Sequence, residues 1–139
     1  MMLPVERDKL ERAQSAAQIA TGLGILAFWV LFFTVGVAPA KPPLCYYAYE
    51  HAFPLPDLTL AIGLIAGGVN ALARRTWGRD VSLACGGGLL FLGLVDLSFN
   101  MQNGLFSGPI VEALQAGVVS AWCVLLGIWI LVAHVASRG

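Results

Sequence analysis

Asp96 is the residue whose type and position most favour chemistry, because it is a carboxylate within an otherwise apolar stretch. An ionisable side chain at membrane depth is costly to bury, so it usually faces other helices or a water-filled space and has a function. Asn100 follows one helical turn later, on the same predicted face. The pair predicts either a binding site for a cation or proton, or a structural hydrogen bond that fastens neighbouring helices.

Further polar groups that could join Asp96 lie in the segments on either side of it. Together, carboxylates, an amide and an imidazole could bind a cation or exchange a proton. Each also has a simpler interpretation, since Asp57 and Glu112 suit the positive start of a helix and the loop residues suit a solvated surface. The candidate ligand- or ion-binding residues are Asp96, Asn100, Glu50, Asp57, Glu112 and His51.

No pattern in the sequence predicts a catalytic group, a metal site or a cofactor. The cysteines Cys45, Cys85 and Cys123 have neither metal-binding nor redox spacing. No nucleophile–base pair or phosphate-binding loop is apparent. The sequence therefore favours a protein that is not an enzyme and that holds no cofactor and no metal.

The composition requires a membrane environment. Of the 139 residues, 58% are hydrophobic and 12% are charged, whereas typical soluble domains have about 45–50% and about 25%. The formal net charge is zero, which argues against nucleic acid as a partner, because phosphate binding needs clustered Lys and Arg. The lipid bilayer is the first predicted partner.

Four apolar segments approach or exceed the roughly 20 residues that a helix needs to cross the hydrocarbon layer. They predict an all-α fold, a polytopic four-helix transmembrane bundle that forms a single domain over residues 1–139. The charged stretch before the first segment contains good helix formers and is expected to extend that helix into the cytoplasm. The predicted spans cover residues 18–38, 57–73, 81–99 and 110–135.

The basic residues predict the orientation of the bundle. Three Lys and Arg residues precede the first span, three lie between the second and third, and Arg138 follows the fourth, with only Lys41 on the other side. Because Lys and Arg concentrate on the cytoplasmic side, both termini are predicted to be cytoplasmic in a multi-pass protein of the cell membrane. The polar residues around Asp96 then gather at the outer face.

Small and aromatic residues predict how the bundle closes. Residues 39–56 are rich in proline and aromatic side chains, so a structured cap is expected, with its tyrosines in an interfacial belt. Gly63 and Gly67 form a GxxxG pattern, which lets helix backbones approach closely in lipid. This pattern predicts packing within one chain or, alternatively, a homodimer face.

Three stretches resemble those of a group of small prokaryotic four-span membrane proteins. They read EHAFPLPD from Glu50, GLVDLSFN from Gly93 and QNG from Gln102, and lie within the middle part of the chain. The resemblance implies the four-span topology and draws attention to these polar residues, but it implies no activity. Small multidrug transporters carry a Glu in their first helix and quinone-linked thiol oxidoreductases carry a CxxC pair, and this sequence has neither.

Three functions remain open from the sequence. The favoured one is a non-enzymatic accessory subunit of a larger membrane complex, or a small-ligand-binding module with an outer polar pocket. The second is a cation or small-solute transporter or channel subunit, which would need a homodimer because the inner half of the spans offers few polar residues. The third is a small membrane enzyme that acts on a lipid-soluble substrate, with Asp96 and either Glu50 or Asp57 as acid and base.

Overall fold

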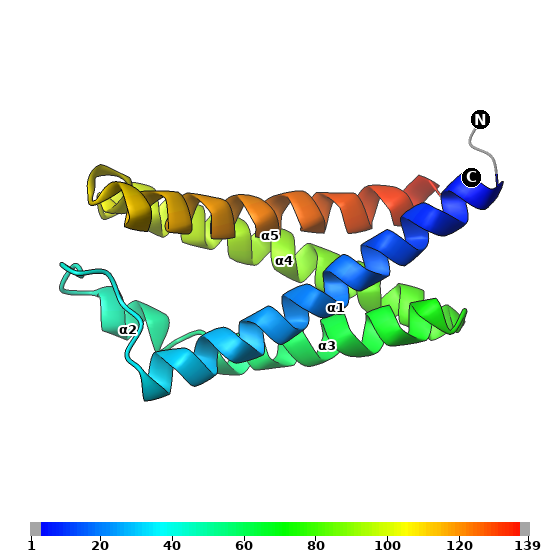
Figure 1. Cartoon of the computed structure of the whole chain (residues 1–139), viewed down its shortest axis with the longest axis horizontal. Helices are drawn as coiled ribbons and strands as arrows, with labels where there is room; N and C mark the ends of the chain where they lie inside the picture. Colours follow the sequence, from blue (N-terminus) through cyan, green and yellow to red (C-terminus); the bar gives the residue numbers. More distant parts are fainter. Residues whose placement is uncertain (1–3, 137–139) are drawn as a thin grey trace.

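The computed structural model describes residues 4–136, which fold as a bundle of helices (Figure 1). The four long helices are apolar enough to cross a membrane, so the chain is a multi-pass membrane protein and the predicted all-α four-helix fold is confirmed. The elements in chain order are α1 (Pro4–Thr34), α2 (Tyr46–Glu50), α3 (Pro54–Leu72), α4 (Thr76–Gln102), the 3-10 helix η1 (Leu105–Ser107) and α5 (Ile110–Ala136).

Helix α1 is longer at its start and shorter at its end than the predicted span. Its 31 residues extend over roughly 46 Å at 1.5 Å per residue, against about 30 Å of hydrocarbon. The charged N-terminal stretch is thus part of the helix, as predicted, and projects beyond the apolar layer. The helix ends at Thr34 rather than at Ala38, because Gly36 adopts a left-handed φ of 78° and its N–H bonds to Leu31 O.

The connection between α3 and α4 is a tight turn. Helix α4 begins at Thr76 rather than at Val81, so most of the loop that the sequence predicted is helical. Gly78 allows this close approach, since a Cβ there would lie 2.5 Å from the backbone N of Ala71. Arg138, which contributed to the predicted orientation, lies outside the described residues.

The long helices form two pairs, α1 with α3 and α4 with α5, and the pairs meet where α3 packs against α4. In Figure 1 α1 crosses α4, and in this view the two pairs separate toward the end that carries α2. We call the end with the N-terminus of α1 and the α3–α4 turn the inner end, following the predicted orientation. The end with α2 and η1 is the outer end.

The glycines of the predicted GxxxG pattern are used within one chain. A Cβ on Gly63 would lie 2.6 Å from Cys85 Sγ, and one on Gly67 would lie 2.9 Å from Gln18 Nε2. Such distances leave no room for a larger side chain. Packing within the chain therefore accounts for this pattern.

An apolar layer closes the middle of the bundle. Its four largest buried side chains are at most 2% exposed, and the thiols of Cys85 and Cys123 are buried beside them. Free cysteines in such a layer behave as small apolar residues. The four large side chains are Leu64, Leu89, Leu126 and Ile130.

The face of α1 that packs into the bundle follows an alternating spacing of three and four residues, as in a coiled coil. Its character changes along the helix, from ion-paired at the inner end through hydroxyl and amide groups to a glycine and then aromatic rings at the outer end. The side chains on this face are Asp8, Glu11, Ser15, Gln18, Gly22, Ile25, Trp29 and Phe32.

Candidate functional site

The outer loop folds over the outer end of the bundle through the five-residue helix α2. Tyr46 is 7% exposed and packs against Trp29. The ring of Tyr49 stacks on Phe99, with centroids 3.7 Å apart and planes 5° apart. The predicted interfacial belt is therefore wrong for Tyr46 and Tyr49, which turn inward, whereas Tyr47 remains 49% exposed. Helix α2 joins the two helix pairs, because it contacts α1 through one tyrosine and α4 through the other.

Asp96 is held by this outer helix. The Tyr49 hydroxyl donates a 2.8 Å hydrogen bond to Asp96 Oδ1. Asn100 lies one turn further along α4, but its Nδ2 donates to Ser120 Oγ of α5 at 3.5 Å. The two residues thus have different partners, and Asn100 fastens α4 to α5.

Asp57 lies in the first turn of α3, yet its carboxylate does not cap that helix. Its Oδ2 accepts a 3.0 Å hydrogen bond from Trp29 Nε1. The residue is only 9% exposed, and its other oxygen, Oδ1, is buried without a hydrogen-bond partner. A helix-start acid would not need this burial, and an unsatisfied buried carboxylate oxygen is expensive to maintain.

Glu50 completes a group of three carboxylates. Burial is the main reason that the pKa of Glu50 is raised to about 7, and the neighbouring Asp96 and Asp57 carboxylates raise it further, while Tyr46 and His51 oppose the change. Asp57 and Asp96 also repel each other electrostatically. We call Glu50, Asp57 and Asp96 the outer acidic cluster.

Among residues 4–136, no Lys, Arg or His side chain forms an ion pair with the outer acidic cluster. Both ion pairs between described residues lie at the inner end. The described part of the chain also contains no group of three or more His, Cys, Asp and Glu side chains placed to hold a metal ion. The arrangement therefore suits a proton, or a small cation whose N–H groups donate to single carboxylate oxygens.

The remaining predicted residues lie beside the cluster. His51 is exposed, packs edge-on against Phe32 with centroids 5.9 Å apart, and has its Nδ1 at the carbonyl of Tyr47. Glu112 Oε1 accepts a 3.0 Å hydrogen bond from Ala40 N and so fastens the outer loop to α5. The structure thus brings together Glu50, Asp57 and Asp96 and gives Asn100, His51 and Glu112 other partners.

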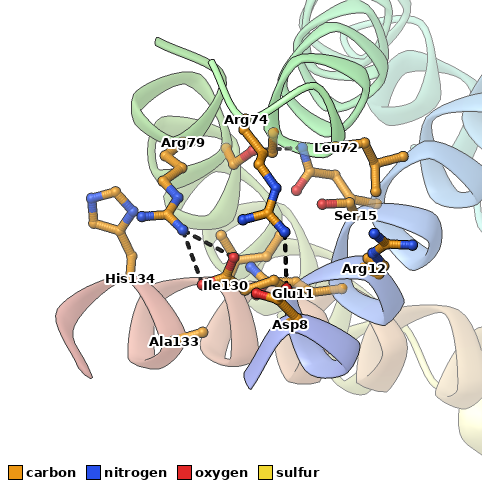
Figure 2. A pocket seen from close by; sticks show the side chains of 14 residues that line it. Asp8, Glu11, Arg12, Ser15, Leu72, Arg74, Arg79, Ile130, Ala133 and His134 are labelled. Atoms are coloured by element: carbon orange, nitrogen blue, oxygen red, sulfur yellow. Dashed lines mark hydrogen bonds and ion pairs between the residues drawn. The ribbon is translucent and has the colours of Figure 1, made fainter. Parts of the chain in front are cut away.

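The sequence did not reveal a second site, the inner pocket, which Figure 2 shows in close-up. This cavity of about 80 Å³ lies between α1, the α3–α4 turn and α5. Arg74 Nη2 pairs with Asp8 Oδ2 at 2.8 Å, and Arg79 Nη2 donates to both Glu11 oxygens at 2.9 Å. These ion pairs tie the start of α1 to the α3–α4 turn.

Hydroxyl and amide groups line the deeper part of the inner pocket. Gln18, only 1% exposed, donates to the Leu64 carbonyl at 2.9 Å and to Ser82 Oγ at 2.8 Å, and Ser82 in turn donates to the Gly78 carbonyl. The signal that could have revealed this pocket was the occurrence of polar residues at intervals of three and four along the first helix. The sequence analysis took the charged residues only as a helical extension into the cytoplasm and so did not predict a pocket.

Comparisons of the chain with protein-family models, with curated proteins and with solved structures give no match.

Proposed function

We propose that this membrane protein binds a small cation at the outer acidic cluster and acts without catalysis, as a ligand-binding module or as an accessory subunit of a larger membrane complex. The observation that supports this most directly is the buried, unpartnered Oδ1 of Asp57. A buried charge is stable only when it is paired or neutralised. A proton, or a cation that donates an N–H, would satisfy this oxygen and reduce the repulsion with Glu50 and Asp96.

Helix α2 would act as the cover of this site. Its tyrosines attach it to α1 and α4, and it supplies Glu50 itself. A ligand larger than a proton would therefore enter when α2 moves away from the bundle. Aromatic rings around the carboxylates favour a cation that is partly organic, since a cation is attracted to the face of an aromatic ring.

We also propose that the site faces the cell exterior. In the described chain, Lys41 is the one basic residue of the outer end, and the other Lys and Arg residues lie at the inner end. By the positive-inside rule this charge distribution supports cytoplasmic termini and an outward-facing acidic cluster in the cell membrane.

Thermal unfolding of the purified protein in detergent tests the proposal, with methylammonium chloride as the probe and sodium chloride at equal ionic strength as the reference. Methylammonium is expected to raise the melting temperature of the native chain and of Glu112→Gln, an acid outside the cluster. Asp57→Asn should lose this stabilisation, because the amide removes the charge. Equal shifts in all three proteins, or no shift in the native chain, would overturn the proposal.

Cation transport is the second candidate, because the inner pocket places Gln18 and Ser82 in the inner half of the bundle. Along α3, Leu64 lies seven residues after Asp57, a rise of roughly 10 Å, and the apolar layer to which Leu64 belongs separates the outer acidic cluster from the inner pocket. Transport would thus require the helix pairs to rearrange. Uptake of labelled methylammonium into proteoliposomes, lost with Asp57→Asn, would favour transport, whereas binding without uptake would favour the binding module.

A further inference from the structure

The inner pocket carries more guanidinium groups than carboxylates. Its lining contains Arg12, Arg74 and Arg79 but only Asp8 and Glu11 as acids, which leaves one net positive charge when His134 is neutral. The excess charge is that of Arg12, because the two ion pairs of the pocket use Arg74 and Arg79. Arg12 makes no ion pair or hydrogen bond with the described residues. A monoanion in the pocket would therefore neutralise its lining.

We propose that the inner pocket binds a phosphate-ester or phosphate anion, supplied either by an anionic lipid headgroup or by free phosphate. Arginine is the side chain best suited to phosphate oxygens, because its planar guanidinium presents several N–H donors at once. Arg74 and Arg79 each use only Nη2 for their ion pairs, and a guanidinium has five N–H donors. A phosphate can thus bind without breaking either ion pair. Figure 2 shows the three arginines around the same pocket.

The backbone at Arg74 supports a role for its side chain beyond the ion pair. Arg74 has a φ of 57°, at the position after a helix end where glycine is usual, and the N–H groups of Arg74 and Arg75 bond back to Ala71 O and Asn70 O. The left-handed conformation is unfavourable for a residue other than glycine. An exposed ion pair stabilises too little to offset this cost, and the Arg74 and Asp8 side chains are 70% and 47% exposed. Anion binding would account for an arginine at this position.

The depth of the pocket suits a phosphate in the headgroup layer. Counting about 20 residues back from Thr34 places the edge of the hydrocarbon near Ser15, so Arg12 lies just outside it. The pocket is also lined by Leu72, Ile130 and Ala133, which offer apolar contact to the adjoining part of a lipid. Basic pockets between membrane helices are known binding sites for anionic headgroups.

Native mass spectrometry of the full chain, released from detergent mixed with defined lipids, tests this proposal. Phosphatidylglycerol is the anionic probe, phosphatidylcholine is the zwitterionic reference, and inorganic phosphate is the soluble competitor. Arg12→Gln should lower the affinity for the anion roughly tenfold, the loss of about one charge-assisted hydrogen bond. Arg7→Gln is the matched control, because Arg7 is exposed on the same helix and does not line the pocket. Neither arginine bonds to the described chain, so both variants should fold.

The outcomes separate the two sources of phosphate. Retention of phosphatidylglycerol over phosphatidylcholine, reduced by Arg12→Gln and resistant to inorganic phosphate, would identify a lipid headgroup. Stabilisation by inorganic phosphate that depends on Arg12, without a preference between the lipids, would identify the free anion. Equal behaviour of Arg12→Gln and Arg7→Gln toward both probes would overturn the proposal. So would the absence of any effect of phosphatidylglycerol and phosphate on the native chain.

Discussion

Replacing Tyr49 with phenylalanine should release α2 from the bundle while leaving its aromatic packing in place. The substitution removes the hydroxyl that donates to Asp96 at 2.8 Å, but it keeps a ring that can stack on Phe99. A hydrogen bond to a charged group contributes about 1.5–3 kcal/mol. Because 1.4 kcal/mol corresponds to a factor of ten, the local opening constant of α2 should rise roughly 10- to 100-fold.

Hydrogen exchange of residues 45–53, followed by mass spectrometry, measures this opening directly, since local opening limits the exchange of hydrogen-bonded amides. Tyr47→Phe is the matched control, because Tyr47 is half exposed in the same helix and its hydroxyl makes no hydrogen bond to the described chain. The exchange of residues 45–53 should accelerate in Tyr49→Phe and not in Tyr47→Phe, while the apolar layer keeps its protection. If the two variants exchanged at the same rate, the Tyr49–Asp96 contact would not be what holds α2.

Three further perturbations test other parts of the structure. The pKa of Glu50 is raised from 4.5 to about 7 when α2 is docked on the bundle, so between these pH values docked α2 keeps a proton that undocked α2 loses. The protection of α2 from hydrogen exchange, corrected for the intrinsic exchange rate, should therefore fall as the pH rises from about 4.5 to about 7. Glu50→Gln should remove this pH dependence. Gly78→Ala would bring a Cβ within 2.5 Å of Ala71 N and should cost roughly 1–3 kcal/mol in a denaturation assay, whereas Gly87→Ala, which meets nothing within 4 Å, should be neutral or stabilising. Leu64→Ala, at a fully buried position, should cost about 2–5 kcal/mol, and a smaller loss would mean that the apolar layer is loosely packed.

Hydropathy predicted the number of long helices well, because a long apolar segment in lipid can satisfy its backbone hydrogen bonds most simply as a helix. The short helices α2 and η1 were not predicted. The ends of the helices were harder to predict. The left-handed Gly36 stops α1 inside an apolar run, and the left-handed Arg74 shortens a turn whose charges had suggested a longer loop. Both depend on local backbone conformations that side-chain polarity does not report.

Sequence analysis singled out Asp96 but not its partner, because Tyr49 is 47 residues away in the chain. Asp57 has a sufficient local explanation as a helix-start acid, and only tertiary structure shows that it bonds to Trp29 instead. The inner pocket escaped for a related reason. The acids of its two ion pairs lie near the start of α1, and their arginine partners lie 66 and 68 residues later in the chain. Their pairing depends on how far α1 extends past the α3–α4 turn.

The graded face of α1 has a consequence for how this helix finds its place in the bilayer. A displacement of α1 by seven residues along its axis would keep the same face toward its neighbours, and lipid would accept most of the apolar residues at either level. Such a displacement would, however, move Glu11 into the place of Gln18 and Ser15 into that of Gly22, where a Cβ would lie 2.8 Å from the Ala61 carbonyl oxygen. Because charged, amide, glycine and aromatic positions follow one another along this face, only one position of α1 along its axis brings each of them against its own partners. The contacts of this face with α3 and α4, such as those that Gln18 makes with Leu64 and Ser82, therefore fix the axial position of α1 in the bundle.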